Sequence, residues 1–336
     1  MAKLIIGIDF SKETMNFCCL DGKTGEILKE SVVPNTDEGC KEMVKELRGL
    51  RSSVVAGDFL FCGENTGIYS LVAADYLTAK HYPVWLETPL EIKLSSGIRR
   101  EKTDSADARM IAEYAFRFRD RARIYRPSSQ TILKLKSWLK VHNELTKNKV
   151  SIRGVLKNSV LDKAAIKPLE VALLTIEEQL KNVNRQIKQT LQDEELKVNA
   201  DLMRTVPGIS DISAAAIIID TQNFTRFNKA RQYAAHTGCI PYKHESGTSI
   251  HRKEHVCKAS NRYINTLLTQ GSVSIMTHNP QMRAYAEKKR SEGKHNGCII
   301  NNIRNKTLHR VFAVIRTQRP FDANYRCTIS ATPAVN

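Results

Sequence analysis

Short apolar segments that end at acidic residues mark the first third of the chain. Residues 4–8 run into Asp9, and residues 59–63 run into Glu64. Runs of branched and aromatic side chains are typical of buried strands. We therefore expect each of these acids at the end of a strand, where it would reach the rim of a sheet.

The same patterns predict the other elements of this region. Asp21–Gly25 has the composition of a hairpin turn, and Thr36 is suited to cap the helix that follows it. The expected strands are 3–9, 15–20, 26–33, 59–64 and 83–86, and the expected helices are 37–50 and 69–79. Hairpin-linked strands followed by β/α alternation predict an α/β domain with a mixed sheet, in the order of a ribonuclease-H-like fold.

Two further acids, Asp104 and Asp107, lie three residues apart at the start of a helical segment. That spacing places both on one helix face. Four convergent carboxylates can be charged together only beside a cation, and Mg²⁺ prefers oxygen ligands. Each acid alone also fits a turn, a helix cap or a dipole contact. The combination of two strand acids and a helix pair favours a metal site.

Long helical patterns follow from residue 128 to about 195. Apolar residues recur at alternating steps of four and three, which is a heptad seam. The seam consists of Leu169, Leu173, Ile176, Leu180, Val183, Ile187 and Leu191. With a first arm over about residues 132–161, we expect a helical hairpin that turns near Lys167-Pro168. It would serve as an arm for oligomerisation or for spanning DNA, or as a spacer between domains.

The last segment contains a short turn between two helical patterns, with Pro207 and Gly208 at its centre. A hydrophobic–Pro–Gly–hydrophobic turn is typical of a helix-hairpin-helix, which presents backbone N–H groups to a phosphate without reading sequence. A tight interhelical turn is the alternative. Helices are expected at 213–219 and 230–236.

Charge divides the chain unevenly. The net charge is +17, yet residues 1–110 hold 14 Lys and Arg against 17 Asp and Glu, and the remainder holds 38 against 18. A basic remainder indicates a polyanionic partner, with nucleic acid the leading candidate. The eight cysteines form no CxxC pair, which favours reduced thiols and a cytoplasmic protein. No apolar run is long enough to span a membrane.

A serine beside a glycine lies among cations in the basic half. We place Ser246 on a loop, where neighbouring cations would stabilise an attacking alkoxide and where His244 or Glu245 would assist proton transfer. A zinc site is the competing interpretation. Its ligands would come from Cys239, His244, His251, His255 and Cys257, but the cysteines are single and cations lie beside them.

These motifs together resemble the DEDD-type insertion-sequence transposases, described as bridge-RNA-guided recombinases, whose N-terminal half is similar to the Holliday-junction resolvase RuvC. The resemblance covers nearly the whole chain. It rests on IGIDFSKE, CGENTGIY, KTDSADARMIAEY, VPGIS and GCIPYKHESG. By this resemblance Asp9, Glu64, Asp104 and Asp107 match the metal-binding acids, and Ser246 matches the nucleophile.

The resemblance implies a Mg²⁺-dependent recombinase, with Mn²⁺ as a substitute, that cuts and rejoins DNA through a 5′-phosphoserine link. It also implies target and donor DNA duplexes, a structured noncoding guide RNA, and a dimer or tetramer in a bacterial or archaeal cytoplasm at the nucleoid. Two alternatives are a hydrolytic junction endonuclease using the acids and water, and a non-catalytic nucleic-acid-binding scaffold that retains the fold. Expected nucleic-acid contacts are Arg99, Arg100, Lys102, Pro207, Gly208, Lys243, Arg252, Lys253, Lys258 and Arg262.

The expected organisation is α/β plus α. Residues 1–125 would form the RuvC-like catalytic domain, and residues 126–198 a coiled-coil connector. Residues 199–327 would form a mostly helical transposase domain that carries the helix-hairpin-helix and the serine, and residues 328–336 a tail.

Overall fold

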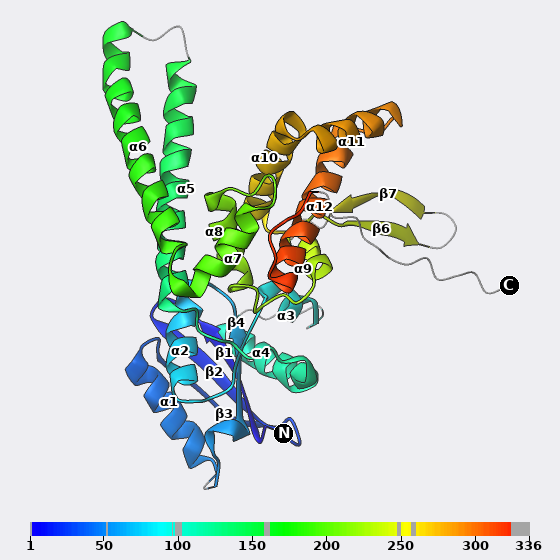
Figure 1. Ribbon diagram of the computed structural model, residues 1–336. Helices are drawn as coiled ribbons and strands as arrows, with labels where there is room; N and C mark the ends of the chain where they lie inside the picture. The colour runs from blue at the N-terminus through cyan, green and yellow to red at the C-terminus, as the bar shows by residue number, and fades with distance from the viewer. Residues whose placement is uncertain are drawn as a thin grey trace, which may run out of the picture. The chain divides into compact units, whose positions relative to one another are not determined.

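The computed structural model describes residues 2–51, 53–95, 97, 103–157, 162–246, 250–256 and 260–323. For residues 163, 242–246 and 250–255 the main chain alone is described. The chain divides into two compact units, residues 1–127 and residues 128–336. Figure 1 labels their helices and strands.

The first unit is built on a five-stranded sheet in the order β3-β2-β1-β4-β5. Its strands are β1 (Leu4–Phe10), β2 (Thr14–Asp21), β3 (Ile27–Pro34), β4 (Phe59–Glu64) and β5 (Val84–Glu87). Strand β2 runs antiparallel to both of its neighbours, while β4 runs parallel to β1 and β5. This order and these directions are those of the ribonuclease-H fold, so the predicted fold class is confirmed.

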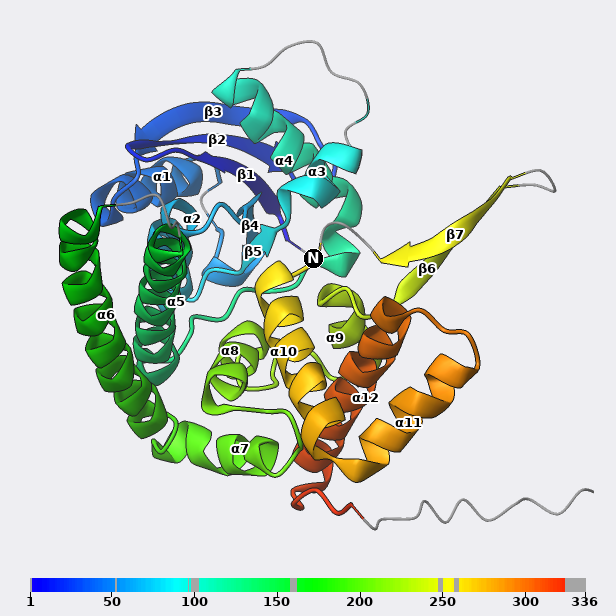
Figure 2. The ribbon, with the colours of Figure 1, turned by 90° about the horizontal axis from the view of Figure 1, so that it is seen from above.

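Helices cover both faces of this sheet. They are α1 (Asp37–Gly49), α2 (Ile68–Ala79), α3 (Pro89–Ser95) and α4 (Asp104–Phe118), with single turns of 3₁₀-helix at Ala56–Asp58 and Arg119–Arg121. Figure 2 shows α4 on one face and α1 and α2 on the other. The alternation of side chains along β1 explains this arrangement, because Ile6 and Ile8 pack in the core with α1 and α2, while Ile5 packs with α4.

Local capping agrees with the sequence at both ends of this unit. The Thr36 side chain accepts a hydrogen bond from Gly39 N–H and begins α1, as predicted. Thr103 does the same for α4 through Ala106 N–H. Asp104 is therefore the first residue of the helix and not its cap, and its side chain is left available for another role.

Two long helices begin the second unit and lie side by side in Figures 1 and 2. They are α5 (Gln130–Leu156) and α6 (Lys163–Thr190). The predicted seam is confirmed over its second half, where Leu180, Val183, Ile187 and Leu191 are buried and the last three belong to one core cluster. Its first three residues, Leu169, Leu173 and Ile176, are half-buried. The predicted turn near Pro168 is wrong, because α6 begins at Lys163 after the cap residue Asp162 and Pro168 lies inside it. A proline there removes one backbone hydrogen bond near the helix start, which the remaining helix tolerates.

The rest of the second unit is helical except for a two-stranded ribbon. Its elements are α7 (Glu194–Arg204), α8 (Asp211–Thr221), α9 (Ala230–His236), β6 (Pro241–Ser246), β7 (Ile250–Val256), α10 (Arg262–His278), α11 (Pro280–Ser291) and α12 (Asn296–Thr317). One hydrophobic cluster joins the bases of α5 and α6 to α7, α8, α9, α10 and α12. Among the described helices, none is long and apolar enough to cross a membrane.

Candidate functional site

Two of the predicted metal-binding acids lie at neighbouring strand ends of the first unit. Strands β1 and β4 are parallel, and Ile8 is paired with Gly63. Asp9 and Glu64 are the next residues along each strand, so both reach the same edge of the sheet. This is the arrangement that the two apolar runs of the sequence predicted.

Helix α4 brings the second pair of acids to this region. Its first turn contains Asp104 and Asp107. The helix packs unusually closely on β1: a Cβ atom added at Gly7 would lie 2.2 Å from Ala112 N and 2.4 Å from Ala108 O. Because a glycine on the strand faces two alanines on the helix, the two backbones approach each other and carry their acids with them.

The pKa of Asp9 reflects its burial and the negative charges around it. The pKa of Asp9 is raised from 3.8 to about 6, first by burial and then by the negative charges of Asp107, Asp104 and Glu64. A hydrogen bond from Phe10 N–H opposes this rise. Burial, followed by the charge of Asp107, also raises the pKa of Glu64. The charges of Glu64, Asp104 and Asp107 thus all act on Asp9, and that of Asp107 also acts on Glu64.

The four acids interact through their charges, but their side chains are not arranged as a complete set of ligands around one metal ion. Over the described part of the chain, no three His, Cys, Asp or Glu side chains are close enough together to hold one metal ion. The chemistry of the donor set nevertheless fits a hard divalent cation, because all four side chains offer oxygen and a nearby cation would reverse the repulsion that raises the pKa of Asp9.

Ser246 is the last residue of β6, in the second unit, and its backbone pairs with Ile250 of β7. The expected loop location is therefore wrong at the level of the main chain: the serine ends a strand of a hairpin. The two segments consist mostly of polar residues in sequence, so no apolar alternation indicated a strand there. The Ser246 side chain itself lies outside the described atoms, as do those of His244 and Glu245.

The base of this hairpin is anchored by a polar network that sequence reasoning did not find. Asn301 donates a hydrogen bond to Cys239 O at 3.0 Å, and Asn265 donates to Thr237 O at 3.0 Å. Arg304 connects the two, because it donates to the side-chain oxygens of Asn301 and Asn265. The Asn301–Arg304 spacing of three on one helix face was the available signal.

The predicted nucleic-acid contacts are distributed over several elements. Pro207 and Gly208 form the turn between α7 and α8, with Gly208 at φ 85°. Arg262 is the exposed first residue of α10. Lys243, Arg252 and Lys253 belong to the β6–β7 ribbon, where only the main chain is described, and Arg99, Arg100, Lys102 and Lys258 lie outside the described residues.

The competing zinc interpretation falls largely on the same ribbon. Cys239 is buried and is a free thiol. The side chains of His244, His251 and His255, and all of Cys257, lie outside the described atoms. Cys239 belongs to no metal-holding group of described residues.

Comparison with known proteins identifies the family. A family model described as "Transposase" (DEDD_Tnp_IS110) matches residues 6–164, and a second, described as "Transposase IS116/IS110/IS902 family", matches residues 200–287. The chain belongs to this transposase family. The two matches cover most of both units, and membership places the chain among enzymes that act on DNA.

Individual relatives agree with this assignment. The pilin gene-inverting protein of Moraxella lacunata is 25% identical over 327 residues, which cover 96% of this chain and 98% of that protein. The IS110 uncharacterized 43.6 kDa protein of Streptomyces coelicolor is 26% identical over 148 residues, 44% of this chain and 36% of that one. A structure of T. thermophilus RuvC in complex with a Holliday junction substrate aligns with TM-score 0.29 and 14% identity, covering 36% of this chain and 99% of RuvC.

Proposed function

We propose that this transposase cuts and rejoins DNA strands with Ser246 as the nucleophile and with the coupled acids as its metal-binding group. The observation that carries the proposal is the placement of Asp9 and Glu64 at one edge of the sheet with Asp104 and Asp107 nearby on α4; burial first, and then the charges of these three acids, raise the pKa of Asp9 to about 6. A protein gains nothing in stability from gathering carboxylates that repel one another. Their convergence is therefore best explained by a cation that they bind.

Asp9, Glu64, Asp104 and Asp107 would hold Mg²⁺, with Mn²⁺ as a substitute. When bound, the ion would stabilise negative charge on the transferring phosphate and on the leaving oxygen. The acids themselves keep the ion at the rim of the sheet, where β1, β4 and the first turn of α4 meet.

The proposed reaction is a transesterification. The Ser246 hydroxyl oxygen attacks the phosphorus atom, a P–O bond to the serine forms, and the P–O3′ bond breaks. The serine loses its proton to a base, and the departing O3′ takes up a proton, which leaves a 5′-phosphoserine link and a free 3′-hydroxyl. Reversal with another 3′-hydroxyl rejoins the strand, so no external energy source is required.

We further infer the partners from the charge of the chain and from the family resemblance. The basic residues beyond position 110, 38 against 18 acids, suit two polyanions at once. These would be target and donor DNA and a structured guide RNA, with base pairing reading the sequence while the protein holds backbones. A dimer or tetramer acting at the bacterial or archaeal nucleoid completes the proposal.

A covalent-adduct assay tests the central step. The purified full-length protein with its RNA is incubated with labelled DNA sites and Mg²⁺, and the products are separated with and without protease treatment. We expect a protease-sensitive DNA adduct with the wild type and with Ser249→Ala, a matched serine three residues away. Ser246→Ala should give no adduct, and neither should Asp9→Ala.

The outcomes distinguish this reaction from hydrolysis. If Ser246→Ala still cuts the DNA while Asp9→Ala does not, water is the nucleophile and the protein is a metal-dependent endonuclease. If Ser249→Ala loses the adduct and Ser246→Ala keeps it, the nucleophile has been assigned to the wrong serine.

A further inference from the structure

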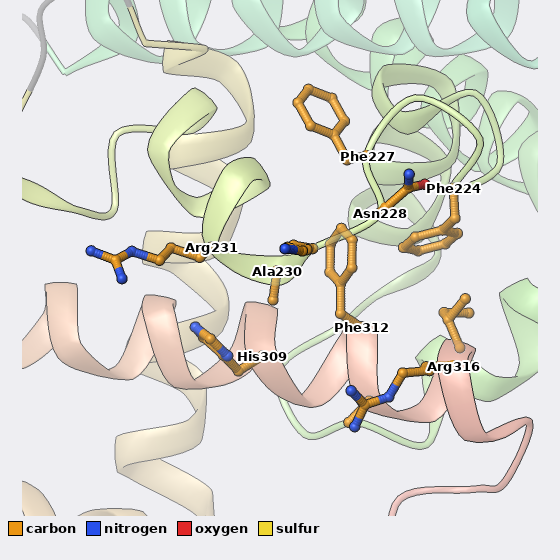
Figure 3. Close-up of a pocket in the computed structure, with 11 residues that line it drawn as sticks. Phe224, Phe227, Asn228, Ala230, Arg231, His309, Phe312 and Arg316 are labelled. Atoms are coloured by element: carbon orange, nitrogen blue, oxygen red, sulfur yellow. The ribbon is translucent and has the colours of Figure 1, made fainter.

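A cavity of about 480 Å³ lies in the second unit between the segment that joins α8 to α9 and the side of α12. Its volume is within the range of small-ligand sites, roughly 300–1,000 Å³. Phe224, Phe227 and Phe312 are among its lining residues, and Figure 3 shows the Phe227 ring directed away from the other two. None of the four acids and no residue of the β6–β7 ribbon lines the cavity, and the reaction proposed above assigns it no role.

The walls of the cavity are aromatic and only half-buried. The ring centroids of Phe224 and Phe312 are 5.2 Å apart, and their planes meet at 82°. The Phe227 ring is already covered, because the Tyr233 and His236 rings each lie 5.1 Å from it and the Arg226 guanidinium lies 5.2 Å from its centroid. Phe224 and Phe312 hold each other in place and still reach solvent, so these two rings offer a surface on which another flat ring can stack.

The rim of the cavity is cationic. Lys229, Arg231, His309 and Arg316 line it and are exposed, and its lining contains no acidic residue. Figure 3 shows Arg231 and Arg316 on opposite sides of Phe312. Among the described residues, none forms an ion pair with Lys229, Arg231 or Arg316, so the charges of these three side chains are available for an anionic ligand.

The backbone at the cavity is strained. Gln222, Asn223 and Phe224 have φ values of 49°, 50° and 67°, a region that non-glycine residues seldom adopt. Their neighbours hold them there: Phe224 N–H donates to Thr221 Oγ1 at 3.0 Å, and the Asn223 side chain donates to Glu195 O at 3.0 Å. Strain of this kind persists where the surrounding structure imposes it, and it occurs often at ligand sites.

We propose that this cavity binds one unpaired nucleotide of the DNA substrate. The base would stack on the aromatic walls, and the flanking phosphates would meet Arg231, Arg316 and Lys229. A site for phosphate alone would not need aromatic walls. A base that is paired in a duplex enters a cavity only at the cost of its pairing and stacking, so an unpaired nucleotide is the favoured ligand. The choice of DNA rests on the proposed function, because exchange of DNA strands exposes unpaired nucleotides.

Fluorescence of a stacked base analogue tests the proposal. The full-length protein is titrated, in EDTA to prevent cleavage, with a DNA duplex carrying 2-aminopurine at a single unpaired position and with a duplex in which the same base is paired. We expect quenching by the protein only for the unpaired probe. Phe224→Leu removes the π-face but keeps apolar volume, and it should weaken binding of the unpaired probe at least about five-fold while changing binding of the paired one little.

A second variant keeps the test valid if Phe224→Leu fails to fold. Arg231→Gln/Arg316→Gln changes exposed side chains only, and it should also weaken binding of the unpaired probe more than that of the paired one. Its matched control, Arg185→Gln/Lys197→Gln, removes the same charge from exposed positions of the same unit. The control should weaken both probes equally, through the general attraction of cations for DNA.

Three results would overturn the proposal: the cavity variants lose equal affinity for both probes, the control pair shows the same selective loss of affinity, or an RNA version of the unpaired probe binds more tightly.

The adduct assay is interpreted separately. If adducts form normally but the cavity variants bind like the wild type, only the cavity assignment is wrong. If no serine adduct forms on any DNA, the proposed function is wrong whatever the binding data show.

Discussion

Replacing Asp9 by asparagine should make the first unit more stable when no divalent cation is present. The substitution keeps the size of the side chain and removes a charge that burial and three neighbouring acids disfavour. The pKa of Asp9 rises from 3.8 to about 6. At about 1.4 kcal/mol per pKa unit this is at most about 3 kcal/mol, and because solvent reaches the site we expect about 1–3 kcal/mol.

The sign of the pH dependence follows from the same shift. The folded unit holds the Asp9 proton more tightly than the unfolded chain, so wild-type stability falls as pH rises from about 4 to about 6. The full cost is present above about pH 6. The advantage of Asp9→Asn should therefore be largest at pH 7–8 and should shrink toward zero as the pH approaches 4.

Trp85 provides the assay. It is 1% exposed in the core of the first unit, and the chain has only two tryptophans. Urea unfolding followed by fluorescence in a Trp138→Phe background therefore reports on this unit alone. Millimolar Mg²⁺ should reverse the order of stability, because a cation that binds the folded acids stabilises the wild type more than Asp9→Asn.

A matched carboxylate with the opposite shift serves as the control. The pKa of Asp58 is lowered, first by a hydrogen bond from Val55 N–H and also by Lys3. Asp58→Asn should therefore destabilise the unit at neutral pH. The electrostatic interpretation of the acids would be refuted if Asp9→Asn were less stable than the wild type at pH 8, or if the difference did not change with pH.

Three further substitutions test packing and anchoring. Gly7→Ala should destabilise the first unit by about 3 kcal/mol or more, because the added Cβ would lie 2.2 Å from the backbone of α4. Trp85 fluorescence during urea unfolding measures this loss of stability. Gly208→Ala should lower the stability of the second unit by about 1–3 kcal/mol, because φ at this residue is 85° and the added Cβ would lie 2.4 Å from Ile275 Cδ1. Trp138 fluorescence during urea unfolding, in a Trp85→Phe background, measures this loss. Arg304→Met should lower the stability of the second unit by about 1–3 kcal/mol and should lower the adduct yield. The reason is that Asn265 and Asn301, at the base of the β6–β7 hairpin, lose the guanidinium that donates hydrogen bonds to both.

Glycines without neighbours provide the controls for these substitutions. A Cβ at Gly49 or at Gly154 meets nothing within 4 Å. Gly49→Ala should leave the first unit unchanged, and Gly154→Ala, inside α5, should stabilise its helix slightly. Equal losses in these variants would mean that alanine is harmful at any glycine of this chain, and the packing argument would fail. If Arg304→Met formed adducts as the wild type does, the hydrogen-bond network of Arg304 would not be needed to position the hairpin.

The elements of the first unit could be predicted because burial and capping are local signals. The strands that carry Asp9 and Glu64 begin as continuous apolar runs, and Thr36 is a strong cap. The convergence of these acids with α4 followed from the strand order of a familiar topology. The closeness of the helix could not be predicted, because it depends on Gly7 meeting Ala108 and Ala112, residues more than 100 positions away in the sequence.

The second unit was harder to predict because its decisive features are polar or depend on tertiary contacts. Ser246 lies on a strand whose neighbours are His, Lys, Arg and Glu, which carry no alternating pattern. Pro168 suggested a turn, yet the cap at Asp162 starts the helix earlier. The positive φ values from Gln222 to Phe224 are imposed by neighbours such as Thr221 and Glu195, and no glycine marks the place.

The contact between Gly7 and α4 has a consequence for how copies of such elements decay in genomes. The four acids can all be present in a copy that has gained a single methyl group at Gly7, and that copy could no longer seat α4 against β1. A survey that counts intact acid motifs would score it as active. Glycine at this strand position, together with Ala108 and Ala112 on the facing helix, is thus a second criterion for distinguishing active copies from inactive ones.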